Sequence, residues 1–159
     1  MRHLLSFLAL PFVVAVVIPI SIARRTPTAL VWPPDVWSAL GALALAIGLV
    51  LFGASLYEFA TRGRGTLAPW DPPRQLVIHG PYRYVRNPMI SGVIVILIAE
   101  ALLTHSRAIG SWAALFTLIN AIYIPLLEEP MLADRFGEPY REYRRHVRRF
   151  VPRLTAWRG

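Results

Sequence analysis

Long apolar runs separated by short polar segments dominate this chain. They cover residues 4–23, 36–57, 89–104 and 108–127. About 20 apolar residues are needed for a helix to cross a bilayer core, and the first, second and fourth runs meet this length. The third run is shorter and contains Glu100, but it lies between two membrane-length runs. The pattern predicts an all-α integral membrane protein with four transmembrane helices in a single domain, residues 1–159.

Composition supports a membrane protein and argues against a soluble domain and against cysteine chemistry. Hydrophobic residues make up 55% of the chain and charged residues 16%, which is too apolar for a soluble domain of this size. There is no cysteine, so disulfides and thiolate chemistry are excluded. The net charge of +8 comes from arginines that flank the apolar runs. This placement favours contact with lipid headgroups, and we expect no nucleic-acid partner.

Arginine counts predict the orientation of the four helices. The N-terminus, the loop 61–88 and the C-terminal tail hold most of the arginines, whereas the opposite side has Arg24, Arg25 and Arg107. By the positive-inside rule, both termini and the long loop are cytoplasmic, as expected for a plasma (inner) membrane protein. The first run could instead be a signal peptide, but its 20 residues exceed the usual apolar core. In the second run, Ala44 and Gly48 form a pair that predicts close helix packing.

A dense polar and aromatic segment, residues 79–89, lies between the second and third runs, and a Glu-Glu pair ends the fourth. The segments resemble those of the integral-membrane methyltransferases, the family of isoprenylcysteine carboxyl methyltransferase and the phospholipid N-methyltransferases. The resemblance covers roughly residues 63–152. It rests on two sets of residues in the family's order: Gly80, Tyr82, Arg86, Asn87, Pro88 and Gly92, then Glu128, Glu129, Phe136, Gly137, Tyr140 and Tyr143.

The resemblance implies methyl transfer from S-adenosylmethionine, with S-adenosylhomocysteine as the product. Arg86 and Asn87 would be the catalytic residues, and Arg86 would orient an anionic group of the acceptor. Carboxylates suit the donor's ammonium or ribose, N–H groups at a helix start suit its carboxylate, and aromatic rings suit its adenine. No metal is expected, because the sulfonium is already an activated leaving group. The expected donor-binding residues are His79, Gly80, Tyr82, Pro88, Met89, Glu128, Glu129, Phe136, Tyr140 and Tyr143.

Glu128 and Glu129 cannot both face one ligand equally, because adjacent helical side chains point about 100° apart. We expect one of them to contact the donor and the other to pair with an arginine of the loop or tail. The sequence does not distinguish them. Glu100 lies far along the third helix and is left out of the site.

The C-terminal tail, residues 130–151, reads as a basic amphipathic helix on the membrane surface, interrupted near Gly137 and Pro139. Its apolar positions recur every three or four residues, and arginines occupy most of the others. These apolar positions are Leu132, Phe136, Tyr140, Tyr143, Val147 and Phe150. The helix could anchor the protein to anionic lipid, cap the donor site, or do both.

Two departures from the family pattern leave the acceptor open. Ile90 stands in place of the family's tyrosine, and Asn87 stands where the prenylcysteine enzymes usually have histidine. A prenylated C-terminus, a phospholipid amine, a lipophilic hydroxy or carboxylic acid, and a small thiol are all possible acceptors. The rival interpretation is a non-catalytic membrane protein that binds lipid or a partner through its basic tail. The oligomeric state is not predicted.

Overall fold

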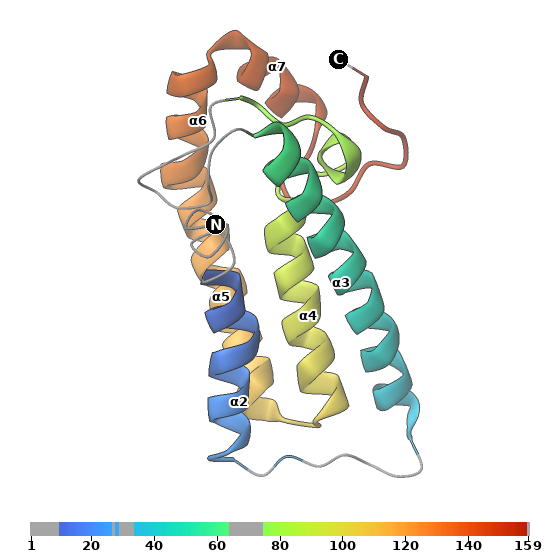
Figure 1. Cartoon of the computed structure of the whole chain (residues 1–159). Coiled ribbons are helices and arrows are strands. Elements are labelled where there is room, and N and C mark those ends of the chain that lie inside the picture. Colours follow the sequence, from blue (N-terminus) through green and yellow to red (C-terminus); the bar gives the residue numbers. More distant parts are fainter. Residues whose placement is uncertain (1–9, 27, 29–33, 64–74, 159) are drawn as a thin grey trace. The chain divides into compact units, whose positions relative to one another are not determined.

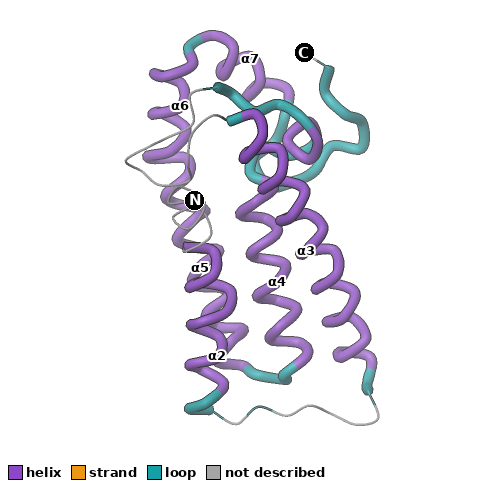
Figure 2. Tube along the Cα trace, viewed as in Figure 1, coloured by secondary structure: helices purple, strands orange, loops and turns teal. Residues whose placement is uncertain are grey.

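The computed structural model describes residues 10–26, 28, 34–63 and 75–158. Every regular element among these residues is helical, and none is a strand (Figures 1 and 2), which confirms the all-α prediction. The main helices are α2 (Ile18–Ala23), α3 (Val36–Arg62), α4 (Pro88–Leu103), α5 (Arg107–Tyr123), α6 (Glu129–Phe136) and α7 (Glu138–His146). The beginning of the first apolar run and the proline-rich part of the loop, residues 64–74, lie outside the described residues.

Among the described residues, two helices are long and apolar enough to cross a membrane, Val36–Arg62 and the continuous stretch Arg107–Phe136. The described parts of the other two apolar runs form shorter apolar helices, Leu10–Ala23 and Pro88–Leu103. Along α3, large apolar side chains such as Leu43, Ile47 and Val50 are more than half exposed. A row of exposed apolar side chains is unfavourable in water and is typical of a surface that faces lipid.

The fourth apolar helix extends beyond the predicted end at residue 127. A π-helical turn, η3 (Ile124–Glu128), joins α5 to α6, so that the helix runs on to Phe136. Pro125 and Pro130 lie at the starts of η3 and α6, but the residues before these starts, Tyr123 and Glu128, are themselves helical. Both prolines are therefore inside the continuous helix, where a π turn can accommodate a missing N–H group. The π turn thus carries the helix past both prolines and past residue 130, where the predicted interfacial tail begins.

The chain divides into two compact units, which are described separately. The first unit contains residues Met1–Val50 and Gly92–Leu118. In it, α3 approaches α4 closely at Gly48, where an added Cβ would lie 2.8 Å from Cγ1 of Ile96 and 3.1 Å from the carbonyl oxygen of Gly92. Close packing at this glycine agrees with the sequence prediction.

A side-chain cap begins α3 in the same unit. Oδ1 of Asp35 accepts hydrogen bonds from the backbone N–H and the hydroxyl of Ser38, both at 2.8 Å. These two hydrogen bonds are the main reason why the pKa of Asp35 is lower than its ordinary value of 3.8. His105, which has a φ of 48°, lies with its Nε2 3.5 Å from the same carboxylate oxygen.

The second unit contains Leu51–Ser91 and Ile119–Gly159, and all the residues of the candidate site belong to it. Its core is formed by Tyr140, Tyr143 and Val147. The side chains packed against this core are Leu76, Ile78, Leu132, Ala133, Phe136 and Trp157. Two of the predicted donor-binding tyrosines are thus also central to the packing of this unit.

The C-terminal tail agrees with the sequence prediction at its interruption but differs from it at its end. The helix breaks at Gly137, whose φ of 64° confirms the expected interruption, and α7 then ends at His146. Val147 is extended, with φ −114° and ψ 126°. The prediction of helix up to residue 151 is therefore wrong. The tail's backbone groups bond to another segment instead: the N–H of Arg153 donates to Tyr84 and that of Trp157 to Arg83.

Candidate active site

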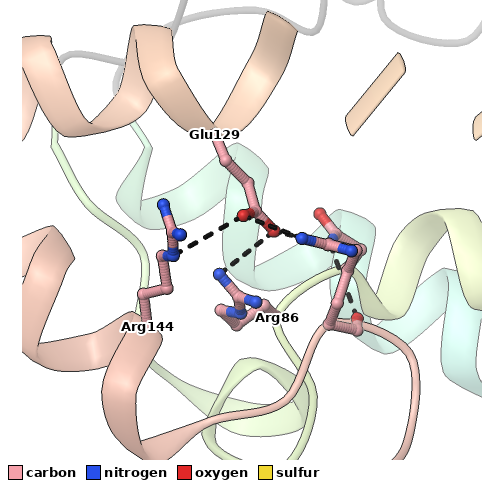
Figure 3. Close-up of polar contacts among 5 residues, drawn as sticks. Arg86, Glu129 and Arg144 are labelled. Carbon is pink, nitrogen blue, oxygen red and sulfur yellow. Dashed lines mark hydrogen bonds and ion pairs between the residues drawn. The ribbon is translucent and has the colours of Figure 1, made fainter. Parts of the chain in front are cut away.

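A buried carboxylate surrounded by arginines is the centre of the candidate site. Glu129 is 1% exposed, and its Oε1 lies 3.1 Å from Nη1 of Arg86. Arg149 donates to both oxygens, from Nε to Oε1 at 2.6 Å and from Nη2 to Oε2 at 3.0 Å. Nε of Arg144 lies 3.7 Å from Oε2. Figure 3 shows Arg86 and Arg144 directed at Glu129.

The arginines differ in how firmly they are held. The Arg86 side chain is 9% exposed, that of Arg149 is 31% exposed and that of Arg144 is 52% exposed. The hydrogen bonds to Glu129 raise the pKa of Arg149 above its ordinary value. One carboxylate therefore faces three guanidinium groups, and the cluster carries an excess of positive charge that favours an anion.

Arg86 also has unused hydrogen-bonding capacity. Its Nε and Nη1 are buried and have no hydrogen-bond acceptor among the described residues, because the contact with Glu129 lacks hydrogen-bond alignment. A buried donor without an acceptor costs about 1–3 kcal/mol, and more when it is charged. A ligand that brings an oxygen to these two N–H groups would remove that cost.

Backbone hydrogen bonds hold the Arg86–Asn87 segment against the tail. The N–H of Arg86 donates to the carbonyl of Arg148 at 2.9 Å, and the N–H of Asn87 donates to that of Arg149 at 3.3 Å. Nδ2 of Asn87 also lies 3.5 Å from the Arg149 carbonyl oxygen. Asn87 is thus fixed at the residue before α4, and Pro88 and Met89, both buried, begin that helix.

A short 3-10 helix, η2 (Gly80–Arg83), forms the other part of the site. Gly80 has a φ of 53°, and an added Cβ would lie 2.9 Å from Cγ and 3.1 Å from Oε1 of Glu58. Glycine adopts this backbone conformation without strain and leaves room for the Glu58 side chain. Glu58, on α3, is also paired with Arg62, whose Nε lies 2.7 Å from Oε2.

Tyrosines connect η2 with α7. The buried Tyr143 hydroxyl donates to the carbonyl of Tyr82 at 2.6 Å, and its ring packs 5.5 Å from that of Trp157. Burial raises the pKa of Tyr82, and the carboxylates of Glu128 and Glu58 raise it further. Burial also raises the pKa of Tyr143. Both phenols therefore stay protonated at neutral pH and can act as hydrogen-bond donors.

The structure brings most of the predicted residues into this one unit, but in different surroundings. Glu129 is the partner of the arginines, whereas Glu128 is half-buried and forms no ion pair among the described residues. Phe136 packs partly buried against Tyr140 and Tyr143. Burial raises the pKa of Tyr140, the Glu129 carboxylate adds to this, and Arg86 opposes it. His79 is exposed at the start of η2 and makes no capping hydrogen bond.

Sequence reasoning did not give specific roles to Glu58, Arg149 or Trp157. Glu58 had a signal, because it is an acidic residue near the end of an apolar run with an arginine four positions later. No feature of the sequence distinguished Arg149 from the other arginines of the tail. Within the described parts of the chain, no three His, Asp or Glu side chains are grouped so that they could hold a metal ion.

Comparison with known families identifies residues 36–139 as a phospholipid methyltransferase sequence, which is more than half of the chain. The chain belongs to the phospholipid methyltransferase family. This confirms the resemblance predicted from the sequence and, with the apolar helices, supports a membrane methyltransferase. The family match begins at the first residue of α3 and ends before Tyr140.

Three curated relatives are similar to parts of the chain. The cobalt-zinc-cadmium resistance protein CzcN of Cupriavidus metallidurans is 31% identical over 126 residues, 77% of this chain and 56% of the relative. Methanethiol S-methyltransferase 1 of Bradyrhizobium diazoefficiens is 35% identical over 74 residues, 45% of this chain and 24% of the relative. Methanethiol S-methyltransferase 2 of the same organism is 36% identical over 80 residues, 48% of this chain and 29% of the relative.

The chain therefore spans between about a quarter and just over half of the length of these relatives. No solved structure matches the chain.

Proposed function

We propose that this family member transfers a methyl group from S-adenosylmethionine to a lipophilic acceptor at the cytoplasmic membrane interface. The observation that carries the proposal is the buried Arg86–Glu129 pair, at 3.1 Å. It joins the two segments of the family resemblance and leaves two buried Arg86 nitrogens without an acceptor. Such a site gains most from a ligand with an anionic group.

The chemical groups present fit the donor. Glu128, which is half-buried and unpaired among the described residues, suits the donor's ammonium or ribose hydroxyls. Tyr140, Tyr143 and Phe136 offer aromatic surface to its adenine, and Tyr82 and His79 lie on or beside η2 as further hydrogen-bonding groups. The N–H groups after Pro88, those of Met89 and Ile90 at the start of α4, suit its carboxylate. When bound, the donor supplies a methyl group on an already activated sulfonium.

The protein's own residues would orient the reactants and exclude water. Arg86 would hold an anionic group of the ligands, and Asn87, beside it, would present its side-chain amide to the acceptor. The excess of arginines around Glu129 supports this role for Arg86. The same excess favours different roles for the two glutamates: Glu129 would orient Arg86, and Glu128 would contact the donor.

The membrane setting is part of the proposal. We propose that residues 1–159 act as one domain with four spans, both termini and the loop 61–88 on the cytoplasmic side of the inner membrane. The basic helix α7 would lie at the headgroup level, where its arginines meet anionic lipid. Two candidate spans and the arginine distribution support this arrangement.

A small thiol is the second candidate acceptor. Two relatives are named as methyltransferases of methanethiol, and their similarity to this chain favours a sulfur nucleophile. A small thiol and a membrane lipid would reach the site by different routes, and a lipid would need a larger apolar surface on the protein to bind it. Purified protein in neutral detergent, given isotope-labelled S-adenosylmethionine, should methylate either lipids of an added membrane extract or methanethiol, and mass spectrometry of the products distinguishes them.

Binding of the product S-adenosylhomocysteine tests the proposal against a non-catalytic lipid-binding protein. Isothermal titration in detergent should give a micromolar dissociation constant for a methyltransferase of this kind. The absence of binding up to millimolar concentration would contradict the proposed function and favour the non-catalytic protein.

A further inference from the structure

In the tail after α7, one residue, Arg149, contacts both Glu129 and Asn87, which come from the two segments of the candidate site. Its guanidinium donates to both oxygens of Glu129, at 2.6 and 3.0 Å. Its carbonyl oxygen accepts the backbone N–H of Asn87 at 3.3 Å and lies 3.5 Å from Nδ2 of the same residue. Arg149 therefore contacts Asn87 through its backbone carbonyl and Glu129 through its side chain.

Arg149 lies beyond the part of the chain that matches the family, which ends at residue 139. The other tail arginine near Glu129 is Arg144, whose Nε is 3.7 Å away and whose side chain is 52% exposed. Solvent weakens such an exposed contact, so Arg144 cannot replace a bidentate pair. Arg149 is thus the tail residue that occupies the carboxylate oxygens of Glu129.

Occupation of both carboxylate oxygens has a consequence for Arg86. A guanidinium and a carboxylate readily form a bidentate pair with two parallel hydrogen bonds. Arg149 already forms this pair with Glu129, so Arg86 approaches with Nη1 alone and keeps Nε and Nη1 free of hydrogen bonds. Without Arg149, Arg86 would be free to turn onto Glu129 and use those donors there.

We propose that Arg149 is a positioning residue that keeps the buried donors of Arg86 available for an anionic group of the ligand. This inference rests on the proposed function. The anionic group is a carboxylate or phosphate, from either the methyl donor or a lipid headgroup. Lysine at position 149 would keep the charge but lack the planar fork that occupies both oxygens of Glu129.

The test uses two probes with the full-length protein in neutral detergent: S-adenosylhomocysteine, which carries the donor's carboxylate, and a short-chain phosphatidylglycerol, which carries a lipid phosphate. Isothermal titration compares the wild type with Arg149→Ala, Arg149→Lys and the matched control Arg148→Ala. The Arg148 side chain is exposed and forms no ion pair within the described chain, so the control removes one positive charge from the same segment. All titrations are made well below each variant's melting temperature, so that a loss of global stability does not change the affinity.

We expect both Arg149 variants to bind one of the two probes about tenfold more weakly, while Arg148→Ala binds like the wild type. A loss confined to S-adenosylhomocysteine assigns the anion to the donor, and a loss confined to phosphatidylglycerol assigns it to a lipid. Wild-type affinity of Arg149→Ala for both probes would overturn the inference, and so would full recovery in Arg149→Lys, which would show that charge alone matters. If the wild type binds neither probe, the proposed function itself has failed.

Discussion

Nη1 of Arg86 lies 3.1 Å from Oε1 of Glu129, and both side chains are at least nine-tenths buried. Buried charges are stable only when they are paired, so removal of one partner leaves an uncompensated charge. Glu128, the next residue, has no such pair among the described residues. Substitution of Glu129 should therefore mainly reduce stability, whereas substitution of Glu128 should mainly reduce donor binding.

We expect Glu129→Gln to destabilise the protein by about 3–5 kcal/mol, the cost of breaking a buried ion pair. Glu128→Gln should leave the melting temperature of the ligand-free protein within about 2 °C of the wild type. Thermal unfolding in detergent measures both. Equal melting temperatures for the two variants would contradict the assignment of Glu129 as the arginine partner.

Glu128→Gln should instead weaken binding of S-adenosylhomocysteine by about 1.5–3 kcal/mol, the value of a hydrogen bond to a charged group. The exposed Glu142, on α7, offers a matched control, Glu142→Gln, which should bind the product like the wild type. Unchanged affinity in Glu128→Gln would remove this residue from the donor site.

Gly80→Ala should be destabilising by about 1–3 kcal/mol, because the residue has a φ of 53° and its new Cβ would press on Glu58. Gly53→Ala is the control within the same unit, since nothing lies within 4 Å of its added Cβ. Alanine is a better helix former, so this control should be neutral or stabilising by up to about 1 kcal/mol. Similar melting temperatures for the two variants would argue against a strained, close contact at Gly80.

Tyr143→Phe removes the hydrogen bond that connects α7 with η2 and leaves the buried Tyr82 carbonyl without this donor. The expected cost is about 1–3 kcal/mol. Tyr84→Phe, at an exposed tyrosine in the same segment, should cost much less. Denaturation of the two variants side by side measures the difference, and hydrogen exchange at η2 should increase in Tyr143→Phe alone.

The cap at Asp35 should make stability depend on pH. The pKa of this group is lower in the folded protein than its ordinary value of 3.8, so its stabilisation is present above pH 3.8 and is lost as the pH falls through the lowered pKa. Asp35→Asn can still accept the Ser38 hydrogen bonds but does not titrate. The difference in melting temperature between wild type and Asp35→Asn should therefore shrink on acidification, and a constant difference would contradict the cap.

The sequence predicted the parts of this protein that depend on local pattern. Apolar runs identified the helices, Ala44 and Gly48 indicated close packing with another helix, and Gly137 and Pro139 indicated an interruption of the tail helix. The π turn after Tyr123 was not predictable, because a proline in a helix can be accommodated by a kink, a break or a bulge. The long-range partners of the site residues were not predictable either. Five arginines between residues 141 and 149 have the same charge, and only the fold shows that Arg149 is the one that pairs with Glu129.

Main-chain hydrogen bonds hold the tail beside residues 84–87: the N–H groups of Arg86 and Asn87 donate to the carbonyls of Arg148 and Arg149, and that of Arg153 donates to the carbonyl of Tyr84. Such bonds depend on the count of residues along the chain more than on which side chains those residues carry. The tail should therefore tolerate many substitutions after Arg149 yet be intolerant of insertions and deletions. Loss of a single residue between His146 and Arg149 would shift the register and carry the Arg149 fork away from Glu129, while the composition of the segment stayed almost the same.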